Sequence, residues 1–176
     1  LIDYIKGKIE NKQEVRLNLI CTHNSRRSHL SQIWAQTMAH HFNVQNVFCY
    51  SGGTEATAMF PKVPATLGKQ GFKILNLSET SNPVYAVKYD KNEPAVVCFS
   101  KTFDDDFNPN SQFAAIMTCS SADEGCPFIA GAEVRLPIRY DDPKAFDGTD
   151  LMDAKYAERS LEIASEMYYV FSKINK

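Results

Sequence analysis

The sequence predicts a single α/β domain in which a central parallel β-sheet is flanked by helices on both faces. Strand-like and helix-like segments alternate along the chain, and no internal repeat or linker divides it. The length of 176 residues is enough for one full hydrophobic core and too short for two ordinary domains. Such alternation favours right-handed βαβ units, whose strands run parallel and are covered by helices.

The expected elements follow from hydrophobic spacing. Apolar runs expected to form strands cover residues 15–20, 47–50, 72–75, 113–118 and 134–138. Segments with apolar residues at helical spacing cover residues 28–42, 62–70 and 150–174. Gly71 fits the position just past the second helix, and Thr149 or Asp150 can cap the last one.

Two segments stand outside this alternation. About residues 83–104 read as an inserted β-hairpin, because two β-like runs are joined by the turn sequence DKNEP. The single domain is expected to span residues 1–176, and residues 1–14, which precede the first strand, are expected to be an N-terminal extension of it.

Composition narrows the classes of function. The formal net charge is −2 and no basic block is present, so we expect no nucleic-acid partner. No apolar stretch approaches the roughly 20 residues that span a bilayer, and the N-terminal segment is charged and amphipathic, so neither a membrane partner nor a signal peptide is expected. Five cysteines form no evident disulfide framework, which favours a reducing, cytoplasmic location.

The stretch LNLICTHNSRRSHL places Cys21 at the end of the first strand and Arg27-Ser28 at the start of the following helix. A tight loop that enters a helix directs backbone N–H groups inward, and the helix dipole adds positive potential. Such a cradle binds a tetrahedral oxyanion and stabilises a thiolate at its centre. Arg27 can grip two oxyanion oxygens, and Ser28 can donate to the sulfur. The predicted oxyanion-binding residues are Thr22, His23, Asn24, Ser25, Arg26 and Ser28. The alternative is a buried cysteine followed by a surface arginine pair.

Two further cysteines lie in TCSSADEGCP, where Cys119 and Cys126 are seven positions apart. The spacing does not fit a zinc site. On a helix the two residues would share a face but lie about 10.5 Å apart along the axis. Because a disulfide needs Cα atoms within about 7 Å, the pair can bond only if the segment unwinds, which is how a redox switch behaves. Two unrelated structural cysteines remain the alternative.

An acidic pair, Asp141-Asp142, precedes Pro143 after the last predicted strand. Proline biases Asp142 toward extended backbone, which helps to hold its carboxylate over a loop. A lone DDP also occurs in ordinary turns, so this element gains meaning only from its position.

The C-x5-R-S loop after the first strand resembles that of the low-molecular-weight protein tyrosine phosphatase superfamily, whose motif usually reads C-x-G-N-x-C-R-S. Cys21, Asn24, Arg27 and Ser28 match it, whereas His23 and Arg26 stand where glycine and cysteine are usual. The C-x6-C-P and DDP elements are similar to those of the thioredoxin-coupled arsenate reductases, a branch with the same fold.

This resemblance implies an arsenate reductase that uses Cys21 as nucleophile, Arg27 as oxyanion clamp and Asp142 as general acid. Cys119 and Cys126 would complete a three-cysteine disulfide relay that a thioredoxin-like partner or another external thiol reduces. It implies arsenate or phosphate as the bound oxyanion, no tightly bound cofactor and no metal.

Two alternatives stay open. A phosphatase would use the same loop to hydrolyse phosphoesters through a phosphocysteine, although DDPKAF lacks the tyrosine usual after the acid in that branch. A non-catalytic oxyanion-binding or redox-sensing module would bind without turnover.

Several other residues are not assigned to the site. Cys49 and Cys98 lie in β-like apolar runs and are expected in the core. His29, His40 and His41 are expected on the helix surface or partly buried. Ser51 ends the second strand, where it either supports the anion loop or forms a plain turn.

Overall fold

A computed structural model describes residues 1–125 and 128–174 of the chain. Cys126, assigned to the disulfide relay from the sequence, lies outside the described residues. None of the helices in the described part has the length and apolar character needed to cross a bilayer.

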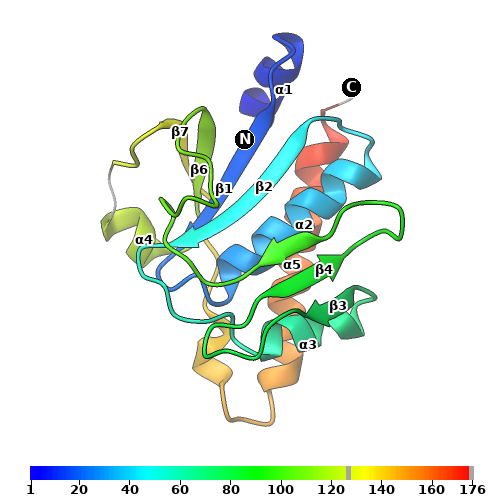
Figure 1. The fold of residues 1–176 in the computed structure, drawn as a ribbon, viewed down its shortest axis with the longest axis vertical. Coiled ribbons are helices and arrows are strands. Elements are labelled where there is room, and N and C mark those ends of the chain that lie inside the picture. Colours follow the sequence, from blue (N-terminus) through cyan, green and yellow to red (C-terminus); the bar gives the residue numbers. More distant parts are fainter. Residues whose placement is uncertain (126–127, 175–176) are drawn as a thin grey trace.

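The centre of the molecule is a four-stranded parallel sheet with the order β2-β1-β6-β7 (Figure 1). β1 (Val15–Cys21) pairs with β2 (Val47–Gly53) on one side and with β6 (Phe113–Met117) on the other. β7 (Ala132–Pro137) extends the sheet beyond β6. The predicted parallel α/β architecture is confirmed, and β1 has neighbours on both sides, so its carboxyl end opens near the middle of one sheet edge.

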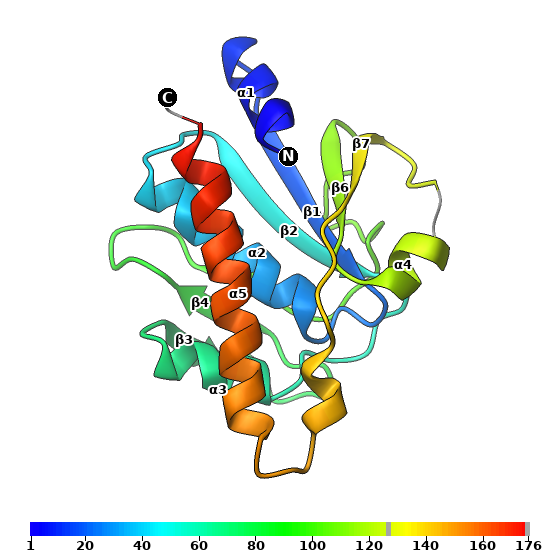
Figure 2. The same ribbon diagram turned by 180° about the vertical axis from the view of Figure 1, so that it is seen from behind.

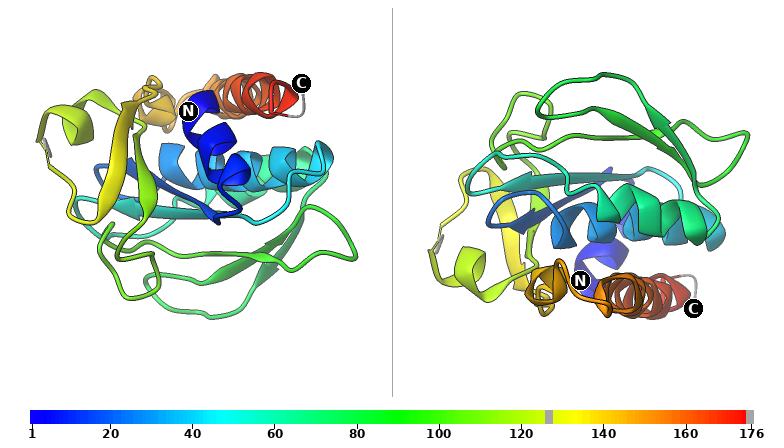
Figure 3. Two further views of the ribbon diagram at one scale, coloured as in Figure 1. Left: turned by 90° about the horizontal axis from the view of Figure 1, so that it is seen from above. Right: turned by 90° about the horizontal axis from the view of Figure 1, so that it is seen from below.

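Helices cover the sheet in layers. α2 (Arg27–His41) packs against β1 and β2, and α5 (Met152–Ser172) lies across α2 on its outer side (Figures 2 and 3). α3 (Lys62–Lys69) packs against α5. Leu17 and Leu19 of β1 are fully buried under this layer. The periodic apolar faces read from the sequence therefore build the main core.

The opposite face of the sheet carries a second, smaller apolar cluster. It includes Ile20 and Met117 from the strands and Ala122 from the short helix α4 (Ser120–Gly125). Ile129, which follows α4, completes the cover. α4 thus rests beside the end of β1, where the anion loop begins.

A separate antiparallel sheet has the order β3-β4-β5. β4 (Tyr85–Lys88) pairs with β5 (Val96–Cys98), which confirms the inserted hairpin. β3 (Lys73–Asn76) pairs with β4 and is not part of the central sheet, although alternation along the sequence groups it with the parallel strands. The reason is exposure: Leu75 is 43% exposed, and a strand with two polar ends cannot be buried on both faces as a central parallel strand must be.

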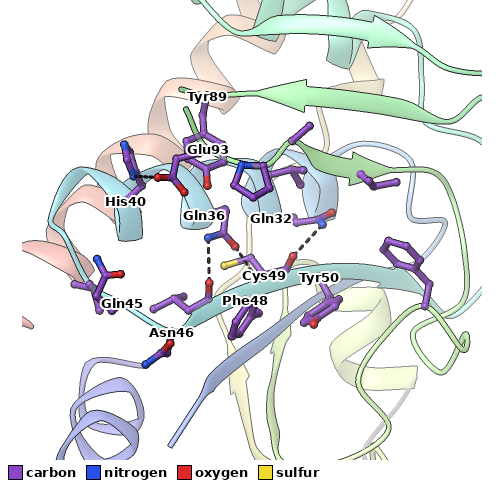
Figure 4. A pocket seen from close by; sticks show the side chains of 17 residues that line it. Gln32, Gln36, His40, Gln45, Asn46, Phe48, Cys49, Tyr50, Tyr89 and Glu93 are labelled. Carbon is purple, nitrogen blue, oxygen red and sulfur yellow. Dashed lines mark hydrogen bonds and ion pairs between the residues drawn. The ribbon is translucent and has the colours of Figure 1, made fainter. Parts of the chain in front are cut away.

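A hollow of about 370 Å³ separates β2 from β5 (Figure 4). The free edge of β2 does not offer its polar groups to this space, because two glutamines of α2 occupy them. Gln36 donates to the Val47 carbonyl and accepts from the Cys49 N–H, each over 3.0 Å, and Gln32 donates to the Cys49 carbonyl over 3.0 Å. None of the residues of the predicted anion loop lines the hollow.

The ends of the chain add two details. Residues preceding β1 form α1 (Ile2–Glu10), where Tyr4 and Lys8 donate to Glu133 over 2.8 and 2.7 Å. At the start of α5, the Thr149 hydroxyl oxygen accepts from the N–H of Leu151 over 3.3 Å, and Asp150 makes no cap.

Candidate active site

The loop between β1 and α2 is folded against the end of β2. The N–H groups of Thr54 and Glu55 donate to the carbonyls of Cys21 and Thr22, over 3.1 and 2.8 Å. Asn24 has a φ of 43°, in the left-handed region that asparagine tolerates better than most other residues. This turn aligns the loop so that β1 ends and α2 begins within a few residues.

Gly53 makes the close approach of loop and strand possible. A Cβ atom at this position would lie 2.7 Å from both the Asn24 nitrogen and the Thr22 carbonyl oxygen, and 2.4 Å from the Glu55 carbonyl oxygen. All three are backbone atoms, which cannot move aside as a flexible side chain would. Only glycine fits behind the loop.

A directed chain of hydrogen bonds ends at the Cys21 sulfur. The backbone N–H of Lys101 donates to Asn24 Oδ1 over 3.0 Å, which fixes the orientation of that amide. Asn24 Nδ2 therefore donates to Ser28 Oγ, over 2.8 Å. Because Ser28 accepts this bond, its own proton is free for Cys21 Sγ, 3.0 Å away. All of these groups are buried, and the chain directs the Ser28 proton at the Cys21 sulfur.

Arg27 and Asp142 face each other at the start of α2. Arg27 Nη2 donates to Asp142 Oδ2 over 2.6 Å, and Nη1 donates to the Tyr140 carbonyl over 3.0 Å. The Nε–H of Arg27 is buried and has no partner among the described residues. A buried donor without a partner costs free energy. The Nε–H of Arg27 can recover that cost by donating to an acceptor such as an oxyanion oxygen.

Asp142 has an extended backbone with ψ of 119°, as expected before proline, and caps the short 3-10 helix η1 (Pro143–Phe146). Its Oδ1 accepts from the N–H of Lys144 over 3.0 Å. The carboxylate is thus held on both oxygens and lies beside the arginine of the anion loop.

Cys119 lies at the margin of the same loop. Its sulfur is 3.5 Å from the Thr22 hydroxyl oxygen, and it accepts from the N–H of Ala122 in α4 over 3.4 Å. The side chain is 1% exposed. The structure therefore brings two cysteines from distant parts of the sequence to one loop.

The remaining predicted loop residues differ in where their side chains lie. His23 is at the exposed rim, with Nδ1 3.4 Å from the Glu55 carboxylate. Ser25 is buried, and its carbonyl accepts from the Phe60 N–H over 3.0 Å. Arg26 does not offer its guanidinium to the loop, because that group is bound to Tyr156 and Asp147. The backbone of Arg26 remains part of the cradle.

Sequence reasoning missed several supporting residues. Lys101 is 2% exposed, and burial lowers its pKa to about 8. His29 is completely buried, not at the helix surface, and its Nδ1 lies 3.2 Å from the Ser51 hydroxyl. Burial, with the nearby charge of Lys101, lowers the pKa of His29 to about 3. No local pattern marks Lys101, since its partner Asn24 is 77 positions away.

No protein-family model and no curated protein matches the sequence. Solved structures do match. YwlE from Bacillus subtilis, in a mutant form, superposes with a TM-score of 0.63 at 13% identity, covering 93% of this chain and 100% of that one. A low-molecular-weight phosphotyrosine phosphatase from Vibrio cholerae gives 0.58 at 14% identity, covering 90% and 94%. An arsenate reductase from Archaeoglobus fulgidus gives 0.56 at 17% identity, covering 89% and 99%.

The chain has the low-molecular-weight phosphotyrosine phosphatase fold. The resemblance read from the C-x5-R-S loop is confirmed at this level, and both phosphatases and arsenate reductases share the architecture. Within residues 1–125 and 128–174, no three His, Cys, Asp or Glu side chains gather as a metal site would require. Within this fold, the candidate catalytic residues are Cys21, Arg27, Asp142 and Cys119, which lie at or beside the anion loop.

Proposed function

We propose that this chain is an arsenate reductase that turns over through a three-cysteine disulfide relay. The observation that carries the proposal is the position of Cys119, whose sulfur lies 3.5 Å from Thr22 Oγ1 at the edge of the nucleophile's loop. Phosphoester hydrolysis needs the loop, the arginine and the acid, and none of its steps uses the thiol of Cys119. Solved structures of the same fold that are named arsenate reductases add support.

In the first step the Cys21 thiolate attacks arsenate held by the loop N–H groups and Arg27. A sulfur–arsenic(V) bond forms, and one arsenate oxygen leaves as water after Asp142 gives it a proton. Ser28, which already bonds the sulfur, stabilises the thiolate before attack.

In the second step the Cys119 thiolate attacks the Cys21 sulfur. The electron pair of the sulfur–arsenic bond passes to arsenic, which leaves as arsenite, and a Cys21–Cys119 disulfide forms. Cys126 then attacks Cys119, which releases the Cys21 thiolate and leaves a Cys119–Cys126 disulfide. A thioredoxin-like dithiol partner returns two electrons by thiol–disulfide exchange. The cytoplasm is the expected setting, because such reductants are kept reduced there.

The test is NADPH consumption with thioredoxin and thioredoxin reductase, with and without arsenate. We expect arsenate-dependent consumption by the wild type and its loss in Cys126→Ser, which should release one arsenite per chain and retain a Cys21–Cys119 disulfide. Cys49→Ala, at a buried core position away from the loop, is the matched control and should keep turnover.

Rapid hydrolysis of an aryl phosphate without any arsenate-dependent NADPH consumption would replace this proposal with the phosphatase alternative. In that case Cys119→Ser and Cys126→Ser should keep full hydrolytic activity. Oxyanion binding without turnover of either kind would make the chain a non-catalytic module.

A further inference from the structure

Two consecutive arginines of the anion loop hold the two ends of η1. Arg27 Nη2 binds Asp142, the residue just before η1, over 2.6 Å. Arg26 Nη2 binds Asp147, the residue just after it, over 2.7 Å. The arginine side chains are only 13% and 10% exposed, whereas the Asp142 and Asp147 side chains are 35% and 25% exposed, so solvent reaches the two pairs only from the carboxylate side.

The Arg26 contact belongs to a closed set of interactions. Arg26 Nε donates to the Tyr156 hydroxyl over 2.6 Å, and that hydroxyl donates to Asp147 Oδ1 over 2.6 Å. The guanidinium also lies over the Phe60 ring, 4.1 Å from its centre. Each member of the triangle formed by Arg26, Tyr156 and Asp147 is therefore fixed by the other two, and one corner is anchored in α5.

In the proposed reaction, Asp142 needs a second support besides Arg27, and this triangle can provide it. Before substrate binds, the Arg27 fork is committed to Asp142 and the Tyr140 carbonyl. When Arg27 grips an oxyanion, its charge is shared with that anion, and its hold on Asp142 weakens. Asp142 must then stay close enough to deliver a proton to the bound oxyanion, although Arg27 now also binds that oxyanion and holds Asp142 less firmly.

We propose that Arg26 is a positioning residue for the general acid: by holding the Asp147 end of η1, it keeps Asp142 over the anion loop while Arg27 binds the oxyanion. This inference rests on the proposed function only in its first step, which the reductase and phosphatase chemistries share. Cysteine, the usual residue at this position in the motif the loop resembles, is too short to reach Asp147.

The proposal is tested by comparing kcat for the hydrolysis of two aryl phosphates. The leaving group of p-nitrophenyl phosphate departs readily without a proton, whereas that of phenyl phosphate depends on the general acid. In Arg26→Met we expect kcat for phenyl phosphate to fall on the order of tenfold to a hundredfold, and kcat for p-nitrophenyl phosphate to fall about threefold or less. Competitive inhibition by inorganic phosphate should change little, because the Arg26 side chain is bound to Tyr156 and Asp147 and only its backbone, which the substitution keeps, belongs to the cradle.

Three further variants sharpen the test. Asp147→Asn should reproduce the leaving-group pattern with almost no change in shape, and combining it with Arg26→Met should add little, since both break the same link. Arg26→Lys, which keeps a charge for Asp147, should recover part of the phenyl phosphate rate. Arg16→Met removes a comparable 2.6 Å ion pair to Glu14 at the other end of β1 and should leave both rates unchanged.

Equal losses on the two substrates in both Arg26→Met and Asp147→Asn would mean that the triangle only stabilises the fold, and would overturn the inference. Unchanged rates in both variants would do the same. If the wild type hydrolyses neither ester and reduces no arsenate, the proposed function itself fails, and the inference falls with it.

Discussion

Ser28 Oγ lies 3.0 Å from Cys21 Sγ and at the same time accepts a hydrogen bond from Asn24. The hydroxyl proton is therefore directed at the sulfur, where it stabilises negative charge. Ser28→Ala removes this donor and leaves the Asn24 amide without its acceptor. We expect alkylation of Cys21 by iodoacetamide at neutral pH, followed on the Cys21 peptide by mass spectrometry, to slow about tenfold, as the loss of about 1.4 kcal/mol predicts.

Ser31→Ala is the control for this prediction. Ser31 is buried on the same helix, and within the described residues its hydroxyl has no hydrogen-bond partner. In the Ser31→Ala variant, Cys21 should be alkylated at the wild-type rate. Equal rates for Ser28→Ala and the wild type would show that Ser28 does not act on the sulfur.

Gly53 sets the position of the loop backbone, so Gly53→Ala should damage anion binding directly. The added methyl group would lie 2.7 Å or less from three backbone atoms, and either the loop or β2 must shift. We expect affinity for inorganic phosphate, measured by calorimetry, to fall more than tenfold. Gly68→Ala in α3 meets only an ordinary contact at 3.8 Å and should bind normally, with stability raised by roughly 0.5–1 kcal/mol. Normal phosphate affinity in Gly53→Ala would refute the role of this close approach.

The parts of the site that could be predicted from the sequence are those whose residues are close in the chain. Cys21, Asn24, Arg27 and Ser28 fall within eight positions, between an apolar strand and an amphipathic helix, and both elements form as expected. The loop geometry follows from that local order, because a strand that runs directly into a helix leaves its backbone N–H groups converging.

The supporting layer could not be predicted in this way. Arg26 reaches Tyr156, 130 positions away, and Asn24 is oriented by the backbone of Lys101. Such pairs depend on how η1, α5 and the segment after β5 pack, which no local periodicity encodes. The same limit applies to β3: its short apolar run indicated a strand, but its sheet was decided by exposure and by the neighbouring hairpin.

Burial of a neutral His29 makes the fold sensitive to acid. Its pKa is about 3 in the folded chain, against 6.5 for an unperturbed histidine, so between these values the unfolded chain binds a proton that the folded chain does not. Stability from this group is fully present above pH 6.5 and is lost as the pH falls toward 3. At pH 5 the loss should be about 2 kcal/mol relative to pH 8, as measured by urea unfolding.

In His29→Asn, which keeps a polar atom within reach of Ser51, this part of the acid-side loss should disappear. His41→Gln, at an exposed position on the same helix, should keep it. An identical pH dependence of unfolding in His29→Asn and the wild type would mean that His29 is not the group responsible.

Asp123 fixes the helix that covers Cys119. Its carboxylate is 5% exposed and pairs with Arg135 of β7 over 2.5 Å and with Arg139 just beyond that strand. Cys119 is almost fully buried under α4, so a reagent reaches its sulfur only when α4 opens. Asp123→Asn weakens the link between α4 and β7, and we expect alkylation of Cys119 in the reduced protein to accelerate on the order of tenfold.

Cys98, completely buried in β5, should stay unreactive in the same sample. Asp153→Asn, which removes two ion pairs between α5 and α3, should leave the Cys119 rate unchanged. If Cys119 reacts no faster in Asp123→Asn than in the wild type, the cover over this cysteine is held by packing alone, and the charge pair does not control when the second thiol becomes available.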